Sequence, residues 1–294
     1  LAIYDISEPT VPTLLGRVVG AASGNGRDLV VSGNYAYSAS SGSGSAGVEI
    51  IDISDKTAPV IVATYATQDQ ISALAITGST LVLAAEGDGI VTVDVSDPAA
   101  PVQFDADATQ STNAVNVTIV SGHAYIIDAT NSMDVYDITN PSSITYVTTL
   151  AGVGVSSALN MNIVRDGTNL YIHDRTVGLS ILDVSVASAP SISATYPALN
   201  FSNSIPSTTR GGMAIDAANN RMLISDQDDL FLYSISNPIA PSLTDTETGW
   251  HDNNSIHVNS NGIVVMTRSY SSAALTCFTL WDASDIYTPN TQLG

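Results

Sequence analysis

A seven-residue segment recurs along the chain and constrains the fold more than any other feature of the sequence. Alternating apolar residues are followed by Asp, then Ile or Val, then Ser or Thr, as in residues 48–54. The copies begin near residues 1, 48, 90, 133, 179, 230 and 278. Ten of the twelve prolines lie in the turn after the motif, so the recurrence is not a coincidence. Self-similarity at a nearly constant interval predicts a repeat architecture.

Each repeat has room for four short strands, because successive copies lie 42 (48 to 90) to 51 (179 to 230) residues apart. Before the motif, two alternating segments flank a Gly or Asn turn, as in residues 29–37, which indicates a β-hairpin. After it, a proline turn leads into another strand, as in residues 59–65. No stretch of ten residues has a capped helical period. We therefore predict an all-β fold, a β-propeller of four-stranded blades.

The strands of a blade are called A, B, C and D in chain order, with the aspartate motif on C. The sequence holds six A, six B, seven C and six complete D strands, within a single propeller domain over residues 1–294. This count favours seven blades, with the missing A and B strands before Leu1. Six blades are the alternative, with residues 11–19 closing the last blade. Because residues 289–294 resemble the start of another D strand, we expect a section of a longer secreted chain.

The repeated segment also carries a resemblance to a known family. The pattern Leu-x-Ile-x-Asp-[Ile/Val]-Ser-x-Pro-x-x-Pro, with Ser-Gly-Asn-Tyr-Ala-Tyr at residues 32–37, resembles the LVIVD-repeat β-propellers of bacterial and archaeal cell-surface proteins. The resemblance covers essentially the whole chain. It implies secretion or surface display and brings no catalytic residues. Two departures are Ser234 in the aspartate column and Ile144 in place of a proline.

Charge and composition exclude several classes of partner. The chain has 28 acidic and 8 basic residues, a net charge of −20, which repels nucleic-acid phosphates and anionic lipid. No apolar run approaches the roughly 18 residues of a membrane span. A single cysteine, Cys277, excludes an intramolecular disulfide and a cysteine-based zinc cluster. Low lysine with abundant Ser, Thr and Asn suits an extracellular protein, although the fold does not explain the low lysine content.

The aspartate of the motif is interpreted as a turn residue. A ring of carboxylates could gather cations, but an Asp before Ser-x-Pro commonly accepts hydrogen bonds from the amides of its own turn. Repetition in every blade favours the structural role. The residues assigned to it are Asp5, Asp52, Asp94, Asp137, Asp183 and Asp282.

A second column of polar residues is placed at the ends of the B strands. It consists of Ser40, Glu86, Asp128, Asp174, Asp226 and Arg268. We expect a carboxylate-rich rim there, on the face formed by the B–C and D–A connections. Calcium needs six or more oxygens, and the best local set is Asp226, Asp228 and Asp229, which does not match an EF-hand loop. No cofactor is therefore expected, with Ca²⁺ as the alternative.

The D–A loops depart most from the repeat, and such loops commonly carry recognition. Residues 197–212 include Phe201 and Arg210, and residues 248–255 include Trp250, His251 and Asp252. Together with Arg268, these side chains suit a protein or glycan at the B–C/D–A face. The alternative is an ordinary surface loop, with the indole packed on the neighbouring blade.

We thus predict an extracellular or cell-surface binding or adhesion module without catalytic activity. No HExxH or Gly-x-Ser-x-Gly motif is present, and no catalytic residue is assigned. One alternative is a structural subunit of a surface layer or filament, which would self-associate by adding the spare C strand or incomplete D strand to a neighbour. A second alternative is a hydrolase or lyase that uses the acidic channel rim.

Overall fold

The fold is described from a computed structural model. Its described residues are 1–8, 11–20, 26–40, 47–111, 113–155, 161–174, 177–197, 212–225, 229–248, 253–258, 263–269 and 276–282. They belong to two units, which are described separately. The first contains residues 1–5, 13–152 and 187–189, and the second contains residues 6–12, 153–186 and 190–294.

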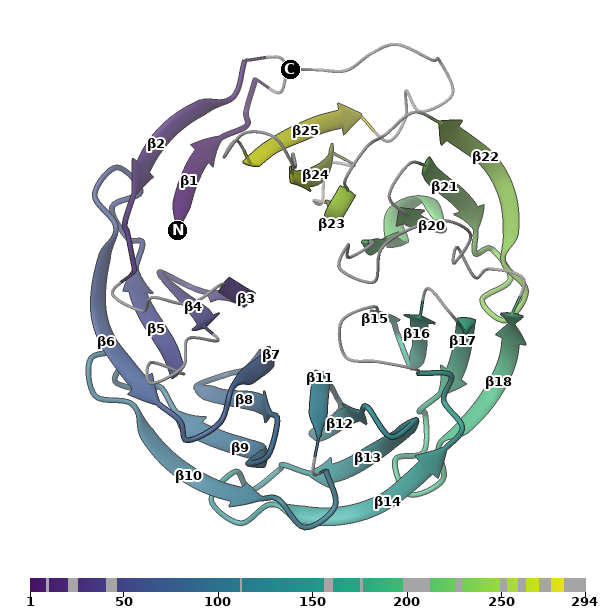
Figure 1. Cartoon of the computed structure of the whole chain (residues 1–294), viewed down its shortest axis with the longest axis horizontal. Helices are drawn as coiled ribbons and strands as arrows, with labels where there is room; N and C mark the ends of the chain where they lie inside the picture. The colour runs from purple at the N-terminus through teal and green to yellow at the C-terminus, as the bar shows by residue number, and fades with distance from the viewer. Residues whose placement is uncertain are drawn as a thin grey trace. The chain divides into compact units, whose positions relative to one another are not determined.

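Antiparallel strands form the first unit (Figure 1). Its sheets are β1-β2, β3-β4-β5-β6, β7-β8-β9-β10 and β11-β12-β13-β14, and the first strands of the last three, β3, β7 and β11, lie side by side. The strands are β1 (Ala2–Asp5), β2 (Thr13–Arg17), β3 (Gly26–Ser32), β4 (Tyr35–Ser40), β5 (Gly47–Asp52), β6 (Val60–Ala66), β7 (Ile71–Thr77), β8 (Thr80–Ala85), β9 (Gly89–Asp94), β10 (Val102–Asp107), β11 (Ala114–Val120), β12 (His123–Asp128), β13 (Ser132–Asp137) and β14 (Thr145–Ala151).

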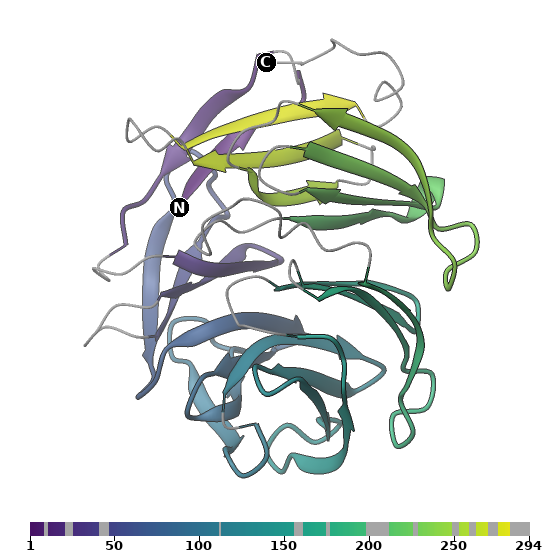
Figure 2. The same ribbon diagram turned by 45° about the vertical axis from the view of Figure 1, so that its right-hand side comes forward.

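The second unit repeats the same arrangement, and its twisted sheets are visible in Figure 2. Its sheets are β15-β16-β17-β18, β19-β20-β21-β22 and β23-β24-β25. The elements are β15 (Met161–Asp166), β16 (Asn169–Asp174), β17 (Gly178–Asp183), β18 (Ser191–Tyr196), β19 (Met213–Asp216), the 3₁₀ turn η2 (Ala217–Asn219), β20 (Arg221–Ser225), β21 (Asp229–Ser234), β22 (Ser242–Thr248), β23 (Asn253–Val258), β24 (Ile263–Ser269) and β25 (Thr276–Asp282).

The prediction of an all-β chain with four strands per repeat is confirmed. Among the described residues, five sheets contain four antiparallel strands in chain order, and this repeated pattern is consistent with a β-propeller. The aspartate motif lies on the third strand of each four-stranded sheet, except that Ser234 takes its place on β21. None of the described residues belongs to a helix with the length and apolarity that crossing a bilayer requires.

The motif aspartates organise the turn after the third strand. Oδ1 of Asp52 accepts a hydrogen bond from the Ser54 N–H at 2.8 Å. The same bond, also of 2.8 Å, joins Asp94 to Ser96, Asp137 to Thr139, and Asp183 to Ser185. The Ser54 side chain and then its N–H hold the pKa of Asp52 below its ordinary value. Each of these carboxylates therefore caps its own turn.

The residue after the aspartate fastens this turn to the hairpin beside it. The N–H of Val95 donates to the Ser79 carbonyl at 2.9 Å, and the N–H of Ile138 donates to the Gly122 carbonyl at 2.9 Å. The side chains of Val95 and Ile138 are buried. The Asp-[Ile/Val]-[Ser/Thr] motif thus combines a capping carboxylate, an apolar anchor and an amide donor.

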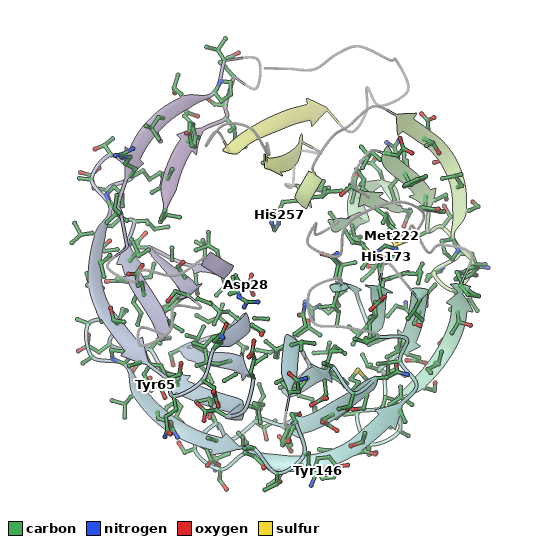
Figure 3. All side chains as sticks on the ribbon, in the orientation of Figure 1. Asp28, Tyr65, Tyr146, His173, Met222 and His257 are labelled. Carbon is green, nitrogen blue, oxygen red and sulfur yellow. The ribbon has the colours of Figure 1, made fainter. Side chains whose placement is uncertain are left out.

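The core lies between neighbouring sheets. On β8, Leu81 and Leu83 pack toward residues of β4 and β5, whereas Val82 and Ala84 pack toward residues of β11 to β13. Every residue of β8 is buried, because both faces of its sheet are covered. In the second unit, Met222 packs with Tyr171 in a similar cluster (Figure 3).

Candidate functional site

A polar network in the first unit joins β3 to the segment before β7 and to the turn after β8. The guanidinium Nη2 of Arg27 donates to Gln70 Oε1 at 2.9 Å. The Gln70 carbonyl accepts the Glu86 N–H at 3.0 Å, and Ser72 Oγ donates to Glu86 Oε1 at 3.4 Å. All four residues are partly buried. They are called the Arg27–Glu86 network below.

Two β-bulges position side chains of this network. The pairing of β3 with β4 passes from Gly26 to Asp28, so Arg27 has no opposite residue. The pairing of β7 with β8 passes from Ile71 to Ala73, so Ser72 has none either. Because a bulge redirects the side chain of its extra residue, both groups leave the regular alternation of their strands.

Asp28 fixes the spacing of the two bulged strands. Its Oδ1 accepts the N–H of Leu29 at 2.8 Å, and its Oδ2 accepts the N–H of Leu74 at 2.7 Å. The carboxylate therefore bridges β3 and β7 directly beside the network, and Figure 3 shows Asp28 between these strands. The positions of Arg27 and Ser72 are set by backbone as well as side-chain bonds.

The loops that carry the network are packed closely. Asp69 N–H donates to Asp88 Oδ2 at 3.3 Å, across the segment before β7 and the turn after β8. A Cβ atom on Gly87 would lie 2.4 Å from Asp69 Oδ2, so glycine is required for this approach unless the Asp69 side chain moves. Nearby on β6, burial and then the charge of Asp88 raise the pKa of Tyr65 (Figure 3).

Arg27 has an uncharged hydrogen-bond partner, although acidic residues far outnumber basic ones in the chain. The chain has 28 acidic residues, yet no carboxylate among the described residues forms an ion pair with Arg27. Its bond to an uncharged amide orients the guanidinium without neutralising it. The network thus offers a cation and donors at Arg27, an amide and a hydroxyl at its centre, and carboxylate acceptors at Glu86.

The strand register corrects the predicted column at the ends of the B strands. Thr80 pairs with Asp94 and His123 pairs with Asp137, and the residues five positions later are Ala85 and Asp128. Ala85 therefore occupies the column, and Glu86 lies one residue beyond it. The prediction for Glu86 was wrong by one position because both residues stand at the end of an apolar run.

The other carboxylates of this column have a structural role. Asp128 is 1 % exposed, and its oxygens accept the N–H groups of Thr130 at 2.8 Å and Asn113 at 2.9 Å. Asp174 is 0 % exposed and accepts the N–H of Val177 at 3.1 Å. The expected carboxylate-rich rim therefore has buried turn caps at these two residues. The hydrolase or lyase alternative stays a prediction.

His173, beside Asp174 on β16, is buried as well (Figure 3). Among the described residues, no group of three His, Cys, Asp or Glu side chains is placed to hold a metal ion. Asp229 begins β21 opposite Thr248, whereas Asp226 and Asp228 lie outside the described residues. The calcium site stays a prediction.

Most of the predicted ligand-binding residues also lie outside the described part of the chain. They are Phe201, Arg210, Trp250, His251 and Asp252. Arg268 is on β24, opposite Asn253 on one side and Cys277 on the other. Sequence reasoning missed Arg27, Gln70 and Ser72. The scarcity of basic residues was the one available signal for Arg27, since a bulge leaves no mark in strand alternation.

Comparison with known proteins supports the repeat assignment. A family model described as "LVIVD repeat" matches more than half of the chain, at residues 1–19, 23–67, 72–104, 112–151 and 161–197. None of the curated proteins shows a significant match to the chain.

Solved structures share the fold at low sequence identity. A functionally unknown protein from Desulfotomaculum acetoxidans has a TM-score of 0.70 at 11% identity, with 96% of this chain and 89% of that chain covered. A protein from Lactobacillus plantarum has a TM-score of 0.71 at 12% identity, with 94% and 85% covered. Saccharomyces cerevisiae Sqt1 has a TM-score of 0.67 at 8% identity, with 96% and 77% covered. At these identities the likeness concerns the fold alone.

Proposed function

Because this chain belongs to the LVIVD-repeat family, we propose that its repeats form the scaffold of a binding module for a protein or glycan. The module has no catalytic activity of its own and works outside the cell or on its surface. Composition supports the location, with 28 acidic residues and a single lysine, Lys56. The binding role is argued from the described residues.

The Arg27–Glu86 network is the observation that carries this proposal. Polar groups copied from repeat to repeat serve the scaffold, as the capping bonds of Asp52 and Asp137 illustrate. The bulge and the backbone bond from Glu86 to Gln70 recur in the next repeat, at Val115 and between Ala129 and Asn113, but among the described residues the side-chain bonds of the network are not copied. Where two other repeats place the buried caps Asp128 and Asp174, this repeat has Ala85 and a partly exposed carboxylate one residue later. In repeat proteins, departures of this kind concentrate on the binding face.

A partner screen tests the proposal. Purified wild-type chain is applied to a glycan array and used in pull-downs from extracellular material, beside the variants Arg27→Ala and Trp250→Ala. Arg17→Ala is the matched control, since Arg17 is an exposed arginine on β2. We expect a captured partner whose binding weakens with Arg27→Ala and not with the control. Equal binding by all variants would remove both predicted regions from the site.

A second candidate is a structural subunit that assembles through its sheet edges. Within the described residues, β1-β2 is a two-stranded sheet and β23-β24-β25 has three strands. Edges of this kind can accept a strand from another molecule. Light scattering after size-exclusion chromatography, at increasing protein concentration, would show growing mass for an assembling subunit. A constant monomer mass excludes this candidate.

The proposed architecture has seven blades, with six as the alternative. Its support is the number of C-type strands, which are β1, β5, β9, β13, β17, β21 and β25. An experimental structure in which β2 pairs with β25, so that residues 11–19 close the last blade, would favour six.

A further inference from the structure

We infer that the Arg27–Glu86 network binds a saccharide that carries a carboxylate, a hexuronate residue of an acidic glycan. In this arrangement Arg27 receives the carboxylate, and Gln70, Ser72 and Glu86 receive ring hydroxyls. The inference rests on the proposed binding function and specifies its ligand class.

The guanidinium of Arg27 is suited to a carboxylate ligand. Arg27 has five N–H donors, and the bond to Gln70 Oε1 uses one of them. Among the described residues it has no carboxylate partner, and the geometry of its donor fork suits a carboxylate ligand. The bulge of β3 and the bond to Gln70 fix the group before a ligand arrives, which lowers the ordering cost of binding.

Glu86, Ser72 and Gln70 offer hydrogen-bond acceptors and a donor for sugar hydroxyls. Glu86 receives the Ser72 hydroxyl on Oε1, and a carboxylate has about four acceptor sites in all. The Ser72 hydroxyl donates its hydrogen bond to Glu86, so its oxygen can accept a hydrogen bond from a ligand hydroxyl. The Gln70 amide nitrogen can donate to one. Neighbouring donors and acceptors of this kind match a row of sugar hydroxyls, each of which both donates and accepts.

The charges select among anionic ligands. Glu86, Asp69 and Asp88 lie around the acceptor end, so a phosphate dianion or a nucleic acid would be repelled there. A hexuronate carries a single negative charge at one end and neutral hydroxyls elsewhere. An amino acid would place its ammonium group at Glu86 but would leave Gln70 and Ser72 without a ligand group to contact.

The experiment is a calorimetric titration of the full chain with di- and trisaccharides of galactose and glucose that end in a single D-galacturonate or D-glucuronate residue. Controls are the corresponding neutral oligosaccharides of galactose and glucose, and the amino acid glutamate. We expect at least tenfold tighter binding of one uronate than of its neutral counterpart. Arg27→Ala should weaken uronate binding about tenfold or more, because a charge-assisted pair is lost. Arg17→Ala should leave it unchanged.

Gln70→Glu provides a second variant that keeps the side-chain size. It places a carboxylate at the 2.9 Å contact, where it competes for the guanidinium, so uronate binding should also fall. Thermal unfolding of each variant verifies that it is folded. Equal affinity for neutral and acidic sugars, preference for glutamate, or full uronate binding by folded Gln70→Glu overturns the inference. The binding role itself survives these results if the partner screen captures another ligand, and it fails with the inference if neither experiment finds one.

Discussion

Asp105 Oδ2 on β10 accepts a hydrogen bond from the N–H of Ile144 at 2.9 Å, 39 residues later in the chain. Ile144 is the residue that replaces the repeated proline, and proline has no N–H to donate. At the equivalent strand position, Gly16 and Ala63 precede turns with Pro59 and Pro101, whereas Asp245 precedes the segment with Pro289 and accepts the N–H of Thr246. Asp105 is therefore paired with a donor that the turns with Pro59 and Pro101 lack.

This pairing predicts a non-additive pair of substitutions. Asp105→Ala leaves the partly buried Ile144 N–H without its acceptor and should lower the free energy of unfolding by about 1–2 kcal/mol. Ile144→Pro removes the donor and should also destabilise. Combined, the two changes reproduce the pattern of Ala63 with Pro101 and should cost less than their sum. Urea denaturation of the four proteins measures the coupling, and strict additivity would contradict the pairing.

The capping aspartates predict loss of stability in acid. Hydrogen bonds from the side chain and N–H of the residue two positions later lower the pKa values of Asp52 and Asp137 below the ordinary 3.8. The same donors lower the pKa of Asp183, its N–H first. A lowered folded-state pKa means that the unfolded chain binds protons first as the pH falls. The contribution is complete above about pH 3.8 and is lost as the pH falls through the lower folded values.

The matched variant carries Asp52→Asn, Asp137→Asn and Asp183→Asn, since asparagine keeps an acceptor oxygen without titrating. Urea midpoints at pH 7, 4, 3 and 2 should fall less steeply for this variant than for the wild type. Parallel curves for the two proteins would assign acid sensitivity to other carboxylates.

The hydroxyl of Tyr136 predicts a stabilising substitution. It is buried beside Ser111, and it forms no hydrogen bond of normal geometry with the described residues. Tyr136→Phe removes this group and should raise the free energy of unfolding by about 1 kcal/mol. Tyr171→Phe is the control and should destabilise, because the Tyr171 hydroxyl donates to the Pro238 carbonyl at 3.1 Å.

Tyr136 also predicts an alkaline effect. Burial raises its pKa from 10.0 to about 12. The unfolded state therefore loses its proton first, and stability should fall between about pH 10 and pH 12. The fall should be smaller in Tyr136→Phe, measured by urea denaturation at pH 9, 10 and 11. An unchanged slope would contradict a buried, neutral phenol.

Replacing the glycine that begins β9 should lower the free energy of unfolding more than replacing a glycine in an open turn. Gly89 has a φ of +70°, and an added Cβ would lie 2.3 Å from the Asp107 carbonyl oxygen. Gly33 has a similar φ of +57° but nothing within 4 Å. Gly33→Ala should therefore cost about 1–2 kcal/mol from the backbone alone, and Gly89→Ala should cost more. Thermal melts compare them, and equal losses would show that β9 and β10 can separate at this point.

The number and order of the strands and the turns after the motif could be predicted, because each depends on a short sequence pattern that recurs along the chain. Alternation around a Gly-Asn turn indicated the hairpin of β3 and β4, and Asp52 with Ser54 form a turn from neighbouring residues alone. The network could not be predicted in this way. The side chain of Arg27 is oriented by a β-bulge and by a hydrogen bond to Gln70, 43 residues away. A hydrogen bond between residues so far apart in the chain depends on how two sheets pack. The distinction between Ala85 and Glu86 likewise depends on strand register, which alternation fixes only to within a residue at the end of an apolar run.

The sheet β7-β10 is covered on both faces, and this sets a limit on engineering by repeat deletion. Excising residues 69–110 would bring together apolar surfaces of β4 and β12 that each fit β8, with Tyr37 meeting Ile126 instead of Leu81 and Val82. The cost of the excision would be the mismatch of two neighbours as well as the loss of one sheet. Shortened versions of this chain should therefore be made by removing a terminal repeat, so that the interior order of the sheets is preserved.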